Sequence, residues 1–434
     1  MKARDLALAT LDEIELPNWP AGVARFPPNT PKQAHHQEDA ELAQRIRIGV
    51  IENLLRINSI IEEYANRPIK KIDPLVLKII GIALYQLLYL DRIPPAAAVD
   101  EAVKQAKAHS RMSATGFVNA VLRRATRERP PALPDAKKSP RDYAKLAYSH
   151  PPELFDRLEA LLGTERALQF CRHSNVAPPT ILRLLPGATK DLLHVGDVSI
   201  FAHRTPGFFV IKPTPHALLR QWSFDGIAQA QDITSAQVVD HCDVHGDMTV
   251  LDRCAGRGTK TMQLAERLGE AGRIIAIDAD RGKLKGLEDV ARHRRRKNVH
   301  WCCGTETNCA DVRKFTPADG FDRVLIDAPC SNSGVLARRA AARYAQTDEA
   351  IASLQELQQF IIRDSVGAVK PGGLLVYSTC SVWPEENEHI TQWILDNFAN
   401  FTRIREKTTL PSIETEDPIA YHDGGFVSVF RRER

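Results

Sequence analysis

From about Gly246 onwards the sequence repeats one pattern, in which a short apolar run is followed by a turn and a stretch with helical spacing. The apolar runs are TVLD, RIIAID, FDRVLID and GGLLVYST. Strands that alternate with helices in this way pair in parallel, because each helix carries the chain back to the starting edge of the sheet. We therefore expect residues 226–434 to form an α/β domain, with a mostly parallel sheet and helices on both faces.

The first 130 residues show a different pattern of apolar residues. Between residues 40 and 129 the apolar positions recur at helical spacing without strand-like alternation, and prolines separate the helical stretches. This predicts an all-helical domain over residues 1–130. Its most apolar stretch, residues 74–90, carries Lys78 and Gln86 and is shorter than a comfortable membrane span. We expect a buried helix there and no membrane association.

Two short regions lie between these domains. Residues 131–142 are rich in proline and charge and are typical of a linker. Residues 143–225 contain two strand-like runs, ILRLLP and GFFVIK. We predict a small α+β subdomain for residues 143–225.

Composition sets only broad limits. A chain of 434 residues exceeds the size of a single core, so several domains are expected. The net charge of +4 suits a nucleic-acid partner but also many metabolic enzymes. The first residues lack the features of a secretory signal, which predicts a cytoplasmic protein. The eight cysteines show no spacing of the zinc type, so we expect free thiols and no metal.

The first β-turn-α unit has a glycine-bearing turn, DRCAGRGTK, at the end of its strand. Such a turn lets a ligand approach the backbone and meet the first amides of the helix. The next strand ends at Asp278, about 20 residues further on, where an acidic side chain can accept hydrogen bonds from both ribose hydroxyls. Together these features favour an adenosine cofactor. Asp278 has an alternative role as a helix cap, although Asp280 is the better candidate for that.

Two further strand ends carry cysteine. Cys330 follows Asp327 in DAPC, and Cys380 ends STC. Residues just beyond the carboxyl ends of parallel strands face one crevice, so both thiols should point at one site. A lone cysteine at such a place is more often a small buried hydrophobic residue. Two of them beside an aspartate and a cofactor turn favour a chemical role.

Methylation of cytosine at C5 suits this set of residues. C5 is too weak a nucleophile to take a methyl group from a sulfonium unless a thiolate first adds at C6. A base must then remove the C5 proton before the thiolate leaves, so two groups are needed. A free thiol titrates near about 8.5, and each cysteine would need a lowered pKa, from a helix N-terminus or a cation such as Lys260. Asp327 could hydrogen-bond the ring N3.

Three motifs in these segments resemble the RsmB/Sun (Fmu) family of ribosomal RNA cytosine-5 methyltransferases. The family's D-x-C-A-A-P-G-G-K-T corresponds to residues 252–261, its D-A-P-C-S-x-x-G-V to residues 327–335, and its Y-x-T-C-S-x-x-P-E-E-N to residues 377–387. The segments IPPAAAVDEAVKQAK and GFVNAVLRR resemble the NusB-like RNA-binding domain of such proteins. The likeness covers nearly the whole chain.

This resemblance implies a Rossmann-like class I methyltransferase domain that uses S-adenosylmethionine. It makes Cys380 the nucleophile and Cys330 the thiol that assists proton removal and product release, with Asp327 as the third catalytic residue. The implied cofactor-binding residues are Cys254, Ala255, Gly256, Arg257, Gly258, Thr259, Lys260, Asp278, Asp311 and Asp327. The expected substrate is RNA, specifically protein-free small-subunit (16S) rRNA, and we expect a monomer.

The cofactor loop departs from the family pattern. Gly256 and Arg257 stand where the family has Ala-Pro, and Thr259 stands where it has Gly. An alternative function is therefore a non-catalytic NusB-like RNA-binding or ribosome-assembly protein with a degenerate cofactor loop. The two thiols in their motif settings argue against it. A nicotinamide dehydrogenase is a second alternative, but nothing near the crevice resembles a hydride-transfer site.

Basic residues offer candidate phosphate contacts. The run RHRRRK at residues 292–297, together with Arg338, Arg339 and Arg343, could neutralise RNA phosphates. A solvated helix face explains the run equally well. Because a cytosine must leave any stack to meet a thiolate, we expect the target to lie in a single strand, a loop or a partly unfolded helix.

Overall fold

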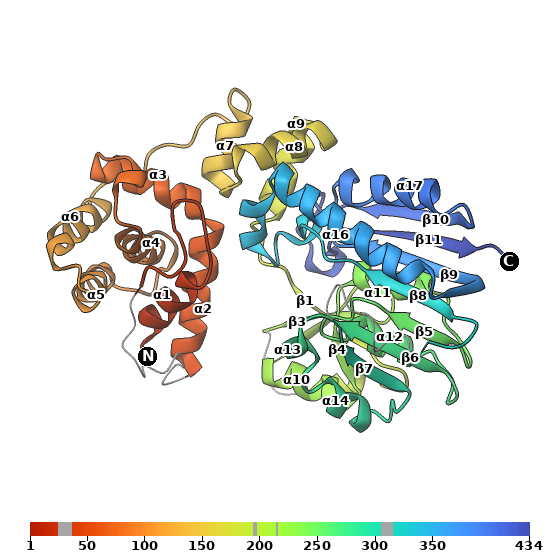
Figure 1. The fold of residues 1–434 in the computed structure, drawn as a ribbon. Helices are drawn as coiled ribbons and strands as arrows, with labels where there is room; N and C mark the ends of the chain where they lie inside the picture. The colour runs from red at the N-terminus through yellow and green to blue at the C-terminus, as the bar shows by residue number, and fades with distance from the viewer. Residues whose placement is uncertain (25–36, 194–197, 214–215, 305–315) are drawn as a thin grey trace. The chain divides into compact units, whose positions relative to one another are not determined.

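The computed structural model describes residues 1–24, 37–193, 198–213, 216–304 and 316–434 (Figure 1). Its internal contacts divide the chain into two compact units. The first unit contains Met1–Asn175 and Ala340–Ala345, and the second contains Val176–Arg339 and Gln346–Arg434. The chain thus returns to the first unit for six residues before it completes the second.

The first unit is helical, as expected for residues 1–130, and its N-terminal part, residues 1–175, runs from red to yellow in Figure 1. Its α-helices are α1 (Ala3–Asp12), α2 (Gln37–Glu52), α3 (Leu54–Ala65), α4 (Pro74–Tyr89), α5 (Pro95–Ala108), α6 (Thr115–Ala125), α7 (Pro140–Tyr148), α8 (Pro152–Leu162) and α9 (Thr164–His173). Short 3-10 turns are η1 (Ile69–Lys71), η2 (Met112–Ala114) and η5 (Ala340–Ala345).

Helix α4 is the apolar stretch that the sequence assigns to the protein interior. Residues 75–86 are all buried, and the Asp73 carboxylate caps the helix by accepting from two amides of its first turn. Lys78 is fully buried, and the cost of burying its charge is offset because its Nζ pairs with the Asp12 carboxylate at 2.6 Å. Within the described residues, no helix is both long and apolar enough to span a membrane.

The second unit begins with a four-stranded antiparallel sheet in the order β2-β3-β1-β4. Its strands are β1 (Thr180–Leu184), β2 (Ser199–Ala202), β3 (Phe208–Lys212) and β4 (Ala228–Ala230), with α10 (His216–Phe224) between β3 and β4. The two expected strand-like runs are β1 and β3. The contacts group α7 to α9 with the first unit, whereas the sequence grouped residues 143–225 together.

A seven-stranded sheet follows, in the order β10-β11-β9-β8-β5-β6-β7. Strands β5 to β9 pair in parallel, and β10 and β11 form an antiparallel edge. The strands are β5 (Thr249–Asp252), β6 (Arg273–Asp278), β7 (Val299–Cys303), β8 (Phe321–Asp327), β9 (Val369–Thr379), β10 (Phe401–Thr409) and β11 (Gly425–Arg432). Its helices are α11 (Ile233–His241), α12 (Thr259–Ala265), α13 (Arg281–Leu284), α14 (Leu287–His293), α16 (Asp348–Val366) and α17 (Glu388–Asn397). Short 3-10 turns are η4 (Ser333–Val335), η6 (Pro384–Glu386) and η7 (Pro418–Ala420).

Both faces of this sheet are covered by helices. Val250 packs in a cluster with residues of α11 and α12, while its neighbour Leu251 packs in a cluster with residues of α16 and α17. Strands β6, β8 and β9 alternate in the same way. Since successive side chains of a strand point to opposite faces, these apolar runs are buried on both sides, as the sequence predicts.

The parallel register brings four strand ends to one edge. Asp252 of β5 pairs with residues of β6 and β8, and Asp327 of β8 pairs with Ser378 of β9. Asp278 ends β6 at the same edge. Ligands bind at such an edge in open α/β sheets, and the candidate site lies there.

Candidate active site

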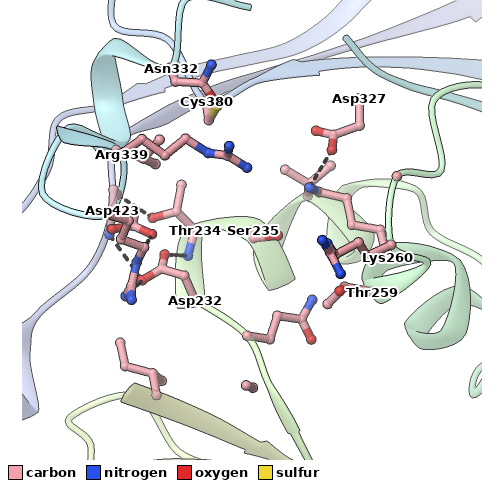
Figure 2. Close-up of a pocket in the computed structure, with 18 of the residues that line it drawn as sticks. Asp232, Thr234, Ser235, Thr259, Lys260, Asp327, Asn332, Arg339, Cys380 and Asp423 are labelled. Carbon is pink, nitrogen blue, oxygen red and sulfur yellow. Dashed lines mark hydrogen bonds and ion pairs between the residues drawn. The ribbon is translucent and has the colours of Figure 1, made fainter. Parts of the chain in front are cut away.

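A cavity of about 570 Å³ lies in the second unit at this edge of the sheet (Figure 2). Seven of the residues that the sequence assigns to the site line it: Ala255, Gly256, Arg257, Thr259, Lys260, Asp327 and Cys380. Four others, Cys254, Gly258, Asp278 and Cys330, adjoin these residues but are not part of the lining, and Asp311 lies outside the described residues. No group of three or more metal-binding side chains occurs among the described residues.

The two thiols meet although they are 50 positions apart. Cys330 Sγ lies 3.2 Å from Cys380 Sγ, because the parallel pairing of β8 with β9 sets their loops side by side. The Cys380 thiol also donates to Asn332 Oδ1 at 3.4 Å, and Asn332 Nδ2 donates to the Cys330 carbonyl at 2.9 Å. Asn332 has a φ of +61°, a conformation in which asparagine is enriched. The sequence analysis did not single out Asn332, because only its distance from Cys380 reveals its contact.

The expectation that both thiols have a lowered pKa is wrong for Cys330. Its hydrogen bond with Cys380, its burial and the negative charges of Cys380 and Glu386 raise the pKa of the Cys330 thiol well above the ordinary value. Each of these effects disfavours a thiolate at this position.

Lys260 forms a charged pair on the cavity wall. Its Nζ donates to Asp327 Oδ2 at 2.7 Å (Figure 2). Ser378 Oγ donates to the other Asp327 oxygen at 2.9 Å. Burial by itself lowers the pKa of the Lys260 ammonium, but the charges of Asp327 and Cys380 outweigh it, so the pKa is raised. Lys260 is therefore a cation within electrostatic reach of Cys380, as the sequence predicts.

The glycine-bearing turn is held by hydrogen bonds in spite of its departures from the family pattern. The Gly256 N–H donates to Asp278 Oδ2 at 2.8 Å, and the Gly258 N–H donates to the Ala255 carbonyl at 2.9 Å. Gly256 has a φ of +58°, and a Cβ there would meet no atom within 4 Å. Its backbone is thus open beside the cavity, which suits close approach of a nucleoside.

Asp278 braces two turns at once. Its second oxygen accepts from the Asp280 N–H at 2.9 Å, while Asp280 caps α13 by accepting from the Gly282 N–H at 2.8 Å. Asp280 is therefore the helix cap, as expected. A carboxylate has about four acceptor positions, so Asp278 retains capacity for ribose hydroxyls. These residues fit the adenosine part of S-adenosylmethionine.

Asp252 is a buried carboxyl behind the turn and was not assigned a role from the sequence. Thr261 Oγ1 donates to its Oδ2 at 2.6 Å, and no described residue donates to its Oδ1. Burial, reinforced by the nearby charge of Asp327, raises the pKa of Asp252 to about 7. The turn thus contains a carboxyl that titrates near neutral pH.

Arg338 and Arg339 differ in their surroundings. Arg338 Nε donates to Asp423 Oδ2 at 2.6 Å, and its guanidinium lies 3.6 Å from Asp232 Oδ2. Burial and the neighbouring Asp232 raise the pKa of Asp423 to about 6. Figure 2 shows Arg339 directed into the cavity. Of these two candidate phosphate contacts, Arg338 is thus engaged in ion pairs with two buried carboxylates.

Only part of the basic run at residues 292–297 is exposed to solvent. The Arg294 guanidinium donates to Ser223 Oγ at 2.7 Å and Gln229 Oε1 at 3.1 Å, which ties α14 to the small sheet. Arg295 and Lys297 are exposed. Arg343 is fully buried in the first unit, so it is not a phosphate contact.

Known protein families match both the N-terminal and the C-terminal part of the chain. The family model described as 16S rRNA methyltransferase RsmB/F matches residues 241–418, and the model of the NusB family matches residues 1–127. The probable ribosomal RNA small subunit methyltransferase B of Bacillus subtilis is 31% identical over 368 residues, which cover 81% of this chain and 79% of the relative. The ribosomal RNA small subunit methyltransferase B of Klebsiella pneumoniae is 31% identical over 365 residues, which cover 82% and 81%.

A solved structure is also similar. The crystal structure of a methyltransferase homolog from Pyrococcus horikoshii is 26% identical, with a TM-score of 0.54. The alignment covers 67% of this chain and 97% of that protein.

Proposed function

Since the chain belongs to the RsmB/F family of 16S rRNA methyltransferases, we propose that it transfers a methyl group from S-adenosylmethionine to C5 of a cytosine in 16S rRNA. The observation that carries the proposal is the 3.2 Å contact between the sulfurs of Cys330 and Cys380 beside the cofactor turn. Cytosine C5 methylation needs two groups of different function at one place, and this pair meets that need.

The Cys380 thiolate adds to C6 of the cytosine, which makes C5 an enamine carbon. Because both Asp327 oxygens already accept hydrogen bonds, from Lys260 and Ser378, we assign the donor at ring N3 to the Lys260 ammonium and not to Asp327. Lys260, held by Asp327, supplies positive charge where negative charge develops on the ring. S-adenosylmethionine, when bound, supplies the electrophilic methyl group. Once Cys380 is bonded to C6, it no longer carries the negative charge that opposes ionisation of Cys330, so Cys330 can lose its proton to solvent. The Cys330 thiolate then takes up the C5 proton, and the C6–sulfur bond breaks with its electron pair returning to Cys380.

The adenosine would bind against the backbone of residues 255–260, with its ribose at Asp278. The target cytosine must enter the cavity to reach Cys380, so the substrate is an unstacked cytosine of 16S rRNA that is free of ribosomal proteins. Residues 1–130 serve as an RNA-binding domain, and the enzyme works as a monomer.

The test is transfer of radiolabelled methyl from S-adenosylmethionine to protein-free 16S rRNA, followed by nucleoside analysis. Label in 5-methylcytosine is expected with the natural chain, and none with Cys380→Ala. No label, together with no heat of S-adenosylmethionine binding in calorimetry, would favour the non-catalytic RNA-binding function instead.

A further inference from the structure

Glu386 is a fully buried glutamate directly beneath both cysteine loops. Its Oε2 accepts from Ser331 Oγ and Ser381 Oγ, each at 2.5 Å. Its Oε1 accepts from the Ser331 N–H at 2.8 Å and from Gln358 Nε2 at 3.2 Å. Ser331 follows Cys330, and Ser381 follows Cys380, so one carboxylate binds the residue next to each thiol.

Neutral contacts alone already join the two loops. Ser333 Oγ lies 2.9 Å from Ser381 Oγ, and the Gly334 N–H donates to the Cys380 carbonyl at 2.9 Å. A buried carboxylate adds a desolvation penalty, which hydrogen bonds must offset, and apolar packing often gives equal stability. Stability is therefore a weak reason for a charge at this position. What the carboxylate adds is a fixed geometry, since its Oε2 accepts from one serine of each loop while its Oε1 accepts from the Ser331 N–H and from Gln358.

We propose that Glu386 is a positioning residue of the catalytic centre, whose carboxylate holds the loops of Cys330 and Cys380 in one register and thereby sets which sulfur attacks the cytosine. The proposal rests on the cytosine methylation proposed above. Glu386 touches neither sulfur, and it acts through Ser331 and Ser381.

The charge of Glu386 acts on the Cys330 thiol in addition to holding its loop. The charged and titratable groups that act on Cys330 are Cys380 and Glu386, and Tyr377 feels the charge of Cys330 in turn. The Glu386 carboxylate is one cause of the raised pKa of Cys330. A neutral side chain at residue 386 would lower that pKa and increase the thiolate fraction of Cys330, whereas removal of a serine hydroxyl would leave the charge in place.

The experiment compares Glu386→Gln with Glu388→Gln in the full-length protein. Glutamine has nearly the same shape, but its Nε2 cannot accept from a serine hydroxyl. Glu388 hydrogen-bonds Thr408 at the surface and serves as the matched control. We expect Glu386→Gln to lower the single-turnover methylation rate between roughly tenfold and a hundredfold, with an unchanged dissociation constant for S-adenosylmethionine. Glu388→Gln should behave as the natural chain does.

Alkylation by iodoacetamide, with each cysteine located by peptide mass spectrometry, gives a readout that loss of stability alone would not produce. In Glu386→Gln the pH profile of Cys330 alkylation should shift to lower pH. An unshifted profile, or a natural single-turnover rate in a folded Glu386→Gln protein, would overturn the proposal.

Ser331→Ala and Ser381→Ala keep the proposal testable if Glu386→Gln does not fold. Each removes one tie to the carboxylate, so each should lower the single-turnover rate without the shift in the alkylation profile. Natural rates in both would contradict the positioning role. If the natural chain itself does not methylate RNA, the proposed function fails, while the alkylation profiles still report whether Glu386 controls the thiols.

Discussion

The contact between Cys330 and Cys380 makes two chemically identical side chains unequal. Each thiol lies at the end of a parallel strand, but the hydrogen bond with Cys380, burial and the Glu386 carboxylate all oppose the ionisation of Cys330. Cys380 instead faces the cavity with the Lys260 ammonium. The division between a nucleophile and an assisting thiol therefore follows from neighbouring charges and not from the cysteines themselves.

Replacement of Cys330 by alanine separates these roles. Cys330→Ala leaves Cys380 able to add to C6 but removes the group that assists release, so a covalent protein–RNA adduct should accumulate and turnover should fall at least roughly a hundredfold. Denaturing gel electrophoresis with labelled RNA measures the adduct. Cys380→Ala and the double variant should show no adduct, and normal turnover of Cys330→Ala would contradict the assignment.

Asp252 gives a prediction for the dependence of stability on pH. Its pKa of about 7 in the folded protein lies above the ordinary aspartate pKa of 3.8, so folding takes up a proton between these limits. Its contribution to stability is present at low pH and is lost as the pH rises through 7, by up to about 1.4 kcal/mol per pH unit. The free energy of unfolding should fall less from pH 5 to pH 8 in Asp252→Asn than in the natural chain. Equal changes in urea titrations would show that Asp252 is ionised throughout.

At the scale of elements, the turn between β5 and α12 depends on Gly258. This residue has a φ of +72°, and a Cβ there would lie 2.6 Å from the Trp301 ring. Gly258→Ala should destabilise the protein by about 2 to 4 kcal/mol, from a left-handed backbone and a steric clash together. Gly286→Ala is the matched control, since Gly286 has a φ of +82° with open space around it. A similar fall in melting temperature for both variants would exclude the clash.

The alternation of strands and helices seen in the sequence corresponds to the seven-stranded sheet and its helices. Parallel strands place Asp278, Asp327, Cys330 and Cys380 at one edge, and this follows from local sequence alone. The residues that form hydrogen bonds around these side chains do not follow from local sequence. Asn332 lies in a loop and Glu386 ends the 3-10 turn η6, and their roles arise from contacts with segments about 50 positions away.

At the scale of the whole molecule, the first unit is completed by a segment from far along the chain. Arg343 is fully buried there and donates to the Tyr148 carbonyl, the Ser174 carbonyl and Asn175 Oδ1. Arg343→Met would remove the arginine donors from these acceptors, of which the Tyr148 carbonyl keeps the Asn175 Nδ2 donor, so we expect a loss of about 3 kcal/mol or more. Scanning calorimetry measures this as a lower melting temperature. Arg339 is exposed and serves as the control, so Arg339→Met should leave the melting temperature unchanged. Equal melting temperatures of the Arg343→Met and Arg339→Met variants would contradict the structural role of Arg343.

The sequence by itself determined the classes of structure and the chemistry of the site. Periodicity distinguished helices from buried strands, and motif residues at strand ends located the thiols and the cofactor turn. Only the tertiary structure decided which arginines are buried, that Cys330 holds its proton, and that Glu386 joins both cysteine loops. Hydrogen bonding, burial and charge depend on neighbours brought together from distant segments, and no local pattern encodes those neighbours.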